Sequence, residues 1–319
     1  MPFASDMQVL TLQGWREWGT LGASAKLATP DPQTRTFKFE EAEIEAFQTD
    51  EPLHKCTSQH IEFSVTGDHT LHVKHGERTA LLKAADTSGG FHIDTLAGYN
   101  FVPLEGPKSP AAQLAGFWLG DGYKISANRI GFGLKKDRKK AYLRDILKRL
   151  GVDWEEGPHK NRPGYRDFVL ALDAPDGKVK KAVNTFIHDW QALAKNKHIN
   201  RAALELDEDG DVVRGLFDAL MFSDGHVKQD RPQLQFTSTS HGLHSDFQLL
   251  SAMLGRDSHF TKHNLSLSYN PDRNQAFEIK GGQVAKAGFN GRIYCAKTSN
   301  GLVIVRGNGQ QFGFVAGCA

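Results

Sequence analysis

The sequence predicts a multidomain chain, with an all-β domain formed by the N- and C-terminal segments and an α+β domain inserted between them. The 319 residues suffice for about two domains of ordinary size. Short runs of alternating apolar and polar residues fill residues 7–105 and return at 276–319. Helical periodicity begins near residue 110. The final segment is too short to bury a core alone, so the two β segments should close one domain.

The first β segment contains alternating runs separated by turn-forming stretches such as QGW, TPDPQ and KHGE. Two similar passes of helices and strands follow. We interpret them as two copies of an αββα unit in tandem. The expected strands of the first segment are MQVLTL, FKFEEAEIEAF, IEFSVTGDHTLHV, RTALLKA and NFVPL. The first pass comprises AAQLAGFWLGDG, RIGFGLKK, KKAYLRDILKRLG and YRDFVLAL, with a further helix over 178–194. The second comprises DVVRGLFDALMFSDG, QLQFTSTS, LHSDFQLLSAMLG and NLSLSYN, before strands return in RIYCAKT and GLVIVRGNGQQFGFVAG.

Composition excludes several classes of protein. Hydrophobic residues make up 39% and charged residues 24%, as in soluble globular proteins. No apolar run reaches the ~18 residues that span a bilayer, and the first residues lack a signal segment. We therefore expect no membrane partner and a cytoplasmic, reducing location. Cys56, Cys295 and Cys318 are too few and too scattered for a disulfide framework or a zinc site, and Cys56 is expected only to pack.

Each pass opens with an apolar helix that runs straight into Asp-Gly. LAGFWLGDG contains Asp121 and FDALMFSDG contains Asp224, 103 residues further on. Small residues at Ala115, Gly116 and Ala219 leave little bulk on one face of each helix, so the two helices should pack closely. That packing would bring Asp121 and Asp224 together. Either Asp-Gly taken alone is explained equally by a helix that ends at a turn.

Two carboxylates at helix C-termini repel each other, so a positive group must accompany them. A hard divalent cation with carboxylate, carbonyl and water oxygens as ligands, such as Mg²⁺, is the natural candidate. Metal-activated water that cuts a phosphodiester between two carboxylates is two-metal chemistry. We therefore predict that Asp121 and Asp224 are catalytic residues that bind two or more Mg²⁺ ions.

The doubled motif resembles the LAGLIDADG homing endonucleases that carry both motifs in one chain. The likeness covers about residues 108–270 and includes LKKDRKKAYLRDILKRLG, KNKHIN and LQFTSTSHGLHSDFQLLSAMLG. It implies a monomer with an internal pseudo-two-fold axis, in which each αββα unit lays a curved sheet into the major groove of double-stranded DNA. The segment after LGRDSHF is short, so loss of a strand pair or of part of the DNA contact is expected in the second unit.

Positive charge gathers in the middle of the chain, although the net charge is only +2. Residues 124–201 hold 19 Lys and Arg against 9 Asp and Glu, which favours a polyanion partner for this part alone. The alternative is a solvated helix face. By the resemblance this block contacts phosphates while strand side chains read base edges. The candidate DNA-binding residues are Lys135, Lys136, Arg162, Arg166 and Lys228.

The flanking β segments resemble intein splicing domains, which have the Hint fold. DMQVLTLQGWREWGTL, SVTGDHTLHV and GRIYCAKTSNGLVIVRGNGQQFGFVAG carry the likeness, and Thr66 to His69 form its Thr-x-x-His signature. The resemblance implies that His69 is the general acid at the N-terminal junction and that Thr66 is its partner, since both groups can hydrogen-bond a scissile amide. Thr-x-x-His taken alone also occurs by chance.

The junction positions depart from the intein pattern. Pro2 occupies the first position and has no nucleophile, while Gly317 and Cys318 close the chain where the penultimate residue and a terminal Asn are expected. Joining of the host protein flanks (exteins) should therefore be disabled, either because the ends were altered or because this is a natural variant, and the Met before Pro2 favours the first. Cys295 stands where some inteins place a nucleophile. The same thiol is otherwise explained as an inert buried Cys.

The expected domains are a splicing domain from 1–107 and 273–319 and an endonuclease domain from 108–272. The predicted function is a site-specific, metal-dependent endonuclease that makes a double-strand break at a long asymmetric target, joined to an inactivated splicing domain. One alternative is a protein that keeps the fold and DNA binding while its nuclease has decayed. Another is a secreted Hint protease, which the insert and the missing export signal disfavour.

Overall fold

The chain divides into two compact units. The computed structural model describes residues 2–58, 60–75, 78–87, 89–190, 193–205, 207–227, 233–260, 265–268, 276–308 and 312–317. The β unit comprises Met1–Phe101, Ser251–Phe260 and Leu267–Ala319, and the αβ unit comprises Val102–Leu250 with a short stretch at Leu265 and Ser266. The predicted domain boundaries differ from these units most at Ser251–Phe260, which pack with the β unit. None of the described helices is long and apolar enough to cross a membrane.

Strands from both ends of the chain make up the β unit. The strands before the insert are β1 (Phe3–Ala4), β2 (Gln8–Thr11), β3 (Gly14–Glu17), β4 (Ser24–Asp31), β5 (Thr36–Thr49), β6 (Leu53–Thr57), β7 (Glu62–Val65), β8 (Thr70–His75), β9 (Arg78–Lys83) and β10 (Phe91–Asp94). Those after it are β19 (Ala276–Ile279), β20 (Val284–Ala287), β21 (Gly291–Lys297), β22 (Leu302–Arg306) and β23 (Phe314–Gly317). Together they form one sheet in the order β19–β10–β8–β23–β22–β2–β4–β5–β21–β1–β7–β6–β20, with β3 on β2 and β9 on β8.

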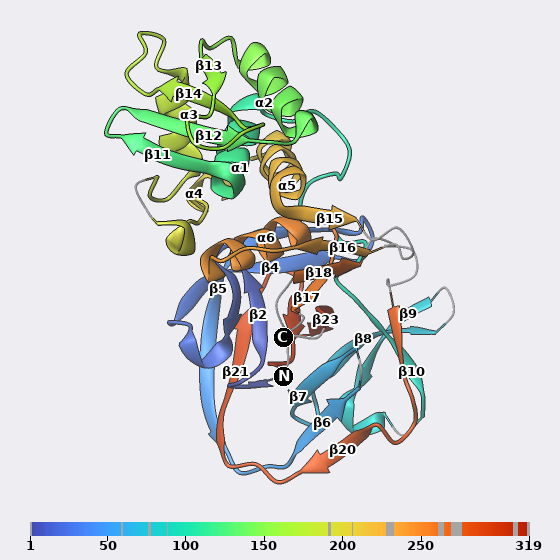
Figure 1. The fold of residues 1–319 in the computed structure, drawn as a ribbon. Helices are drawn as coiled ribbons and strands as arrows, with labels where there is room; N and C mark the ends of the chain where they lie inside the picture. Colours follow the sequence, from blue (N-terminus) through green and yellow to red (C-terminus); the bar gives the residue numbers. More distant parts are fainter. Residues whose placement is uncertain are drawn as a thin grey trace. The chain divides into compact units, whose positions relative to one another are not determined.

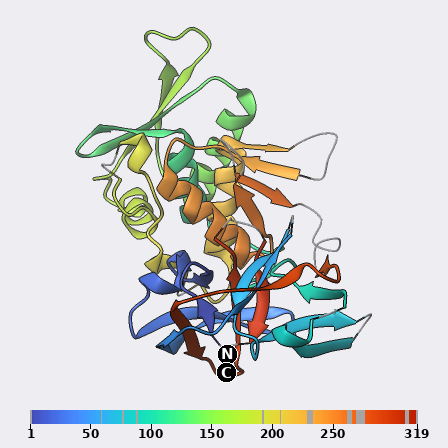
Figure 2. The same cartoon turned by 90° about the horizontal axis from the view of Figure 1, so that it is seen from below.

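The two chain ends share the core of this unit. β1 pairs with β21 at Phe3 and Tyr294, and β2 pairs with β22. Phe3 stacks on Trp18 with ring centroids 5.1 Å apart, and both lie with Phe314 in one buried cluster. Figures 1 and 2 show blue N-terminal and red C-terminal strands side by side. The two β segments therefore form one unit, as the strand pattern predicted.

The first repeat of the αβ unit is a four-stranded sheet covered by helices. Ile130, Phe132, Phe168 and Leu170 alternate along its two central strands and are buried, which fixes the helix-covered face. Its elements are α1 (Pro110–Asp121), β11 (Gly122–Ser126), β12 (Arg129–Leu134), α2 (Asp137–Leu150), β13 (Glu155–Pro158), β14 (Arg166–Ala171) and α3 (Lys178–Phe186), with the strands in the order β11–β12–β14–β13.

The second repeat follows a short helix, α4 (Ala202–Glu205), and has the same order of elements. It comprises α5 (Asp211–Asp224), β15 (Gly225–Val227), β16 (Gln233–Phe236), α6 (His241–Met253), β17 (Ser258–Phe260) and β18 (Leu265–Ser268). Its strands lie in the order β15–β16–β18–β17. The second strand pair is therefore short but present, and the expected loss of that pair is wrong.

Two further element predictions are corrected by backbone chemistry. The helix expected over 178–194 ends at Phe186, because the β-branched Ile187 is extended and bridges Ile199. No strand forms over 100–104, where Asn100 makes only an isolated bridge to Thr36 and Pro103 has no N–H to donate.

Helices α1 and α5 lie side by side and meet through small residues (Figure 1). A Cβ added to Gly116 would lie 3.0 Å from the Ala219 Cβ, and one added to Gly215 would lie 3.1 Å from the Ala112 Cβ. A Cβ on Gly120 would lie only 2.6 Å from the Cβ of Ser223. Each residue thus meets the one 103 positions away, so a pseudo-two-fold axis runs between the helices.

Candidate functional site

The paired helices α1 and α5 end at Asp121 and Asp224. The glycine after each aspartate lets the backbone continue directly into a strand. Ser109 caps the start of α1 by accepting from the Ala112 N–H, and Pro110 occupies the first helical position. Gly122 and Gly225 are extended, with φ of −84° and −83°, so neither adopts a left-handed turn. A Cβ on either would instead overlap its own helix, at Trp118 or Met221.

Two buried lysines accompany the two aspartates. Lys139 from α2 is 9% exposed, and its Nζ donates to Asp121 Oδ2 at 2.5 Å. Lys197 is 6% exposed and interacts electrostatically with both carboxylates. Burial first, and then the Asp121 charge, raise the pKa of Asp224, while the two lysines oppose that rise. The positive charge that the paired carboxylates require is thus supplied in part by the chain itself.

Lys197 is held by the C-terminal carbonyls of α1. Its Nζ donates to the carbonyl oxygens of Trp118 at 2.9 Å and Gly122 at 2.7 Å, and more weakly to that of Leu119 at 3.3 Å. These carbonyls lie at the C-terminal end of α1, where the helix dipole favours a cation. Burial lowers the pKa of Lys197 to about 8, although Asp224 and Asp121 oppose this shift.

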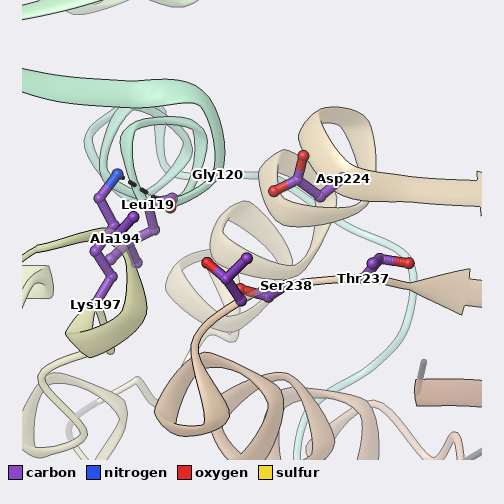
Figure 3. A pocket seen from close by; sticks show the side chains of 8 residues that line it. Leu119, Gly120, Ala194, Lys197, Asp224, Thr237 and Ser238 are labelled. Carbon is purple, nitrogen blue, oxygen red and sulfur yellow. Dashed lines mark hydrogen bonds between the residues drawn. The ribbon is translucent and has the colours of Figure 1, made fainter. Parts of the chain in front are cut away.

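A pocket of about 320 Å³ opens beside this group. Figure 3 shows that Lys197 and Asp224 reach it from different elements, with the lysine bonded to the end of α1. Hydroxyl-bearing residues after β16 complete the wall. The lining residues are Leu119, Gly120, Ala194, Lys197, Asp224, Thr237, Ser238 and Thr239. The arrangement offers anionic, cationic and hydroxyl groups to one bound molecule.

The open face of the first sheet begins directly after Asp121. Tyr123 and Ile125 are 41% and 44% exposed on this face, over a floor that contains Gly131. Asp167 lies on the same face, where its Oδ1 accepts from the Tyr123 hydroxyl at 3.4 Å and is 4.0 Å from His159 Nε2. This surface therefore combines apolar groups with hydrogen-bond acceptors.

The DNA-binding candidates differ in their surroundings. Lys135 and Lys136 are exposed at the start of α2, and Arg162 lies 5.7 Å from the Tyr165 ring centroid. Arg166 instead lies on the helix-covered face, because it alternates with Asp167, and its Nε donates to Glu156 at 3.0 Å. Its role in DNA binding stays a prediction. Lys228 lies outside the described residues.

The oxygen donors at this site fit Mg²⁺ only in part. In the part of the chain that the structure describes, no group of three or more His, Cys, Asp or Glu side chains is placed to hold a metal. Mg²⁺ in phosphoryl-transfer sites is commonly held by one or two carboxylates, with water and substrate phosphate as the other ligands. Asp121 and Asp224 match that donor set, so a DNA phosphate would have to complete the site.

A second group of predicted residues gathers in the β unit beside strand β1. Thr66 and His69 flank a turn between β7 and β8, where the His69 N–H donates to the Thr66 carbonyl at 3.1 Å. The Thr66 N–H donates to the Pro2 carbonyl at 3.4 Å, and the His69 ring centroid lies 4.4 Å from that of Phe3. The Thr66 hydroxyl donates to Asp68 at 2.5 Å, a bond that lowers the Asp68 pKa.

Strand register brings the other predicted junction residues to the same place. Phe3 pairs with Tyr294, so the ladder extended by one residue sets Cys295 opposite Pro2. Ala316 pairs with Leu71, which in the same way sets Gly317 opposite Thr70, next to His69. Cys318 lies outside the described residues. Cys56 is buried elsewhere in the core, where burial raises its pKa to about 11 and keeps the thiol unreactive.

Two functional residues were missed by reasoning from the sequence. Lys139 is one of several lysines in the run KKDRKK, and nothing in that run distinguishes it from solvated neighbours. Lys197 lies in KNKHIN, which carried part of the family likeness but no predicted role. A lysine in a short stretch between two helical repeats was the signal that could have found it.

No protein-family model and no curated protein matches the chain. Among solved structures it is similar to the N-terminal LAGLIDADG domain of WhiA, at 12% identity and a TM-score of 0.33 over 57% of this chain and 79% of that one. It is similar to the homing endonuclease I-DmoI in complex with its target DNA, at 13% identity and 0.35 over 52% and 92%. It is also similar to the homing endonuclease I-WcaI bound to its DNA recognition sequence, at 16% identity and 0.31 over 54% and 80%. Likenesses at these TM-scores assign neither a family nor an activity.

Proposed function

We propose that the αβ unit is a metal-dependent endonuclease that makes a double-strand break in DNA at a long asymmetric target. The observation that carries this proposal is the meeting of Asp121 and Asp224 across a pseudo-two-fold axis, beside two buried lysines. Duplex DNA has local two-fold axes that relate its two strands, so a paired site of this kind matches both backbones. The repeats differ at Gly116 and Ala219, which supports an asymmetric target.

The side chains divide the chemistry between them. Mg²⁺ bound by Asp121 and Asp224 would supply a Lewis acid and an activated water. Lys139 holds the Asp121 carboxylate in place and offsets its repulsion of Asp224. Lys197 places a buried cation where negative charge develops on the attacked phosphate, and such charge is stabilised strongly in a buried site.

DNA contact follows from the surface next to the aspartates. Lys135 and Lys136 neutralise backbone phosphates, which supplies affinity that does not depend on sequence. The major groove admits a two-stranded β ribbon, and the open face of the first sheet presents Tyr123, Ile125 and Asp167 to it. Apolar groups contact thymine methyls and a carboxylate accepts from a cytosine amino group, so this face reads base edges.

A randomised duplex library tests the proposed activity, because it presents many different target sequences at once. The purified chain is incubated with the library in Mg²⁺, and the new DNA ends are sequenced. The proposal predicts double-strand breaks at one long site without dyad symmetry. Binding to DNA with no cutting in Mg²⁺ or Mn²⁺ would overturn it and favour a fold whose nuclease has decayed.

We further propose that the β unit is an intein-type splicing domain whose junctions are disabled. The gathering of Thr66, His69 and Cys295 beside Pro2 supports this second function. The Pro2→Cys, Cys318→Asn double variant is placed between two flanking peptides, the second of which begins with Cys in place of Ala319 to receive the acyl group, and it should yield ligated flanks. The same variant with His69→Ala is the control and should not. If the double variant stays inert, the junction positions are wrongly assigned.

A further inference from the structure

The segment from Lys197 to Arg201 brings the buried lysine to the end of α1. We propose that Ser240 and Asp246, both on or beside the first half of α6, are positioning residues that fix this segment and so hold Lys197 in the site. The inference rests on the proposed nuclease. It concerns residues that line neither the pocket nor the aspartate pair, and that act through the lysine segment.

Ser240 anchors the lysine residue itself. Its side chain is fully buried, and its Oγ donates to the Lys197 carbonyl at 2.6 Å. The same oxygen accepts from the Leu243 N–H at 3.1 Å and so caps the first turn of α6. Gly242 lets the segment approach this turn, because a Cβ there would lie 3.1 Å from the Cβ of His198. The backbone of Lys197 is thereby tied to a helix end.

Asp246 anchors the next part of the segment through both carboxylate oxygens. It is 2% exposed, and its Oδ2 accepts from the Ile199 N–H at 2.6 Å while its Oδ1 accepts from Arg201 Nε at 2.7 Å. Charge-assisted bonds of this length are among the stronger ones in proteins. Because the His198 carbonyl and the Asn200 N–H bond the residues at the end of α3, the Lys197 carbonyl and the Ile199 N–H point to the other side, which faces α6.

The opposite side of the segment pairs with the residues that follow α3. Ile199 bridges Ile187, and the His188 N–H donates to the His198 carbonyl at 3.1 Å. These backbone bonds hold the segment laterally but leave the Lys197 carbonyl to Ser240. Loss of the α6 anchors should therefore let Lys197 shift while the rest of the segment stays paired.

A small shift of this lysine has a large consequence for catalysis. A displacement of about 1 Å can cost about 100-fold in rate when a group must lie at a fixed distance from the reacting atoms. We therefore expect Ser240→Ala and Asp246→Asn each to lower the single-turnover cleavage constant by about 10- to 100-fold. The Kd for DNA should not change, because neither residue faces the DNA-contacting surface.

A double-mutant cycle separates positioning from general stabilisation. In the Lys197→Met background, Ser240→Ala and Asp246→Asn should add no further loss of cleavage, since their effect passes through the lysine. Asp207→Asn is the matched control, because Asp207 is also buried and accepts from two backbone N–H groups, but those of Val212 and Val213 in α5 and not those of the Lys197–Arg201 segment. Asp207→Asn should lower the free energy of unfolding, and any effect on cleavage should be the same with or without Lys197.

A second readout does not depend on nuclease activity. Acetic anhydride labelling of Lys197, followed by mass spectrometry of the full chain, should be slow in the wild type and at least about 10-fold faster in Ser240→Ala and Asp246→Asn. Asp207→Asn should label like the wild type. Unchanged labelling in both α6 variants overturns the positioning proposal, as do additive losses of cleavage in the cycle. A wild type that shows protected Lys197 but cuts no DNA overturns the proposed function alone.

Discussion

Replacing Gly120 by Ala tests whether the close packing of α1 and α5 sets the separation of Asp121 and Asp224. The added Cβ would lie 2.6 Å from the Cβ of Ser223 and 3.3 Å from Asp224 Oδ2. Carbon atoms prefer separations of about 3.5–4.0 Å, so the helices must part by roughly 1 Å at this level. Overpacking of this kind costs about 1–3 kcal/mol, and the better helix propensity of Ala returns at most about 1 kcal/mol.

The assay combines urea unfolding with single-turnover cleavage of the DNA target. Gly120→Ala should lower the free energy of unfolding by about 1–2 kcal/mol and cleavage by about 100-fold. Adding Ser223→Gly removes the clashing side chain and should restore both. Gly157→Ala is the matched control, because nothing lies within 4 Å of its added Cβ. A Gly120→Ala variant as stable and as active as the wild type would refute the close-packing argument.

Four further variants probe charges and hydrogen bonds elsewhere in the chain. Lys135→Gln should weaken DNA binding and reduce the salt dependence of log K by about 0.9, whereas Arg166→Gln should leave that slope unchanged and lower stability, since Arg166 pairs with Glu156. Equal slopes for both variants in salt-titrated binding would contradict this. Tyr142→Phe removes a 2.7 Å hydrogen bond to Asp218 and should cost about 1–2 kcal/mol in urea unfolding; no loss would show that the bond contributes nothing. Burial raises the pKa of Asp257 to about 7, so the folded chain binds a proton at this carboxyl more tightly than the unfolded chain. The stability that this bound proton contributes is lost as pH rises from about 4 to 7. Asp257→Asn should remove at most about 4 kcal/mol of the change in unfolding free energy with pH. The same pH dependence in the variant and the wild type would show that Asp257 does not cause it.

The sequence was most informative where one pattern was repeated. Both Asp-Gly motifs end helices that carry small residues. Small residues allow two helices to pack closely, so the pattern predicted that Asp121 and Asp224 meet. The contact between Gly120 and Ser223 was not predicted, because the two residues differ in type. Their equivalent positions, 103 residues apart, become evident where the two helices meet.

Residues whose role depends on a distant partner could not be predicted in the same way. Lys197 becomes a buried cation only because the fold sets the segment around it against the end of α1. The face of the sheet on which Arg166 lies could not be predicted for a related reason: register fixes that face, and a shift of one residue in register reverses it. The strand β11 was missed because its alternation of Tyr123 and Ile125 with polar residues is confined to Gly122–Ser126, directly after the Asp-Gly that ends the helix.

Whether Asp121 and Asp224 together cut DNA is decided on the target recovered from the randomised library. Cleavage and DNA binding are measured in Mg²⁺ for the wild type, Asp121→Asn and Asp224→Asn. We expect each variant to bind the target with nearly unchanged Kd and to lose at least about 1,000-fold in cleavage, because it lacks one of the two carboxylates that position the metal. Cleavage at the wild-type rate by either variant would contradict this expectation.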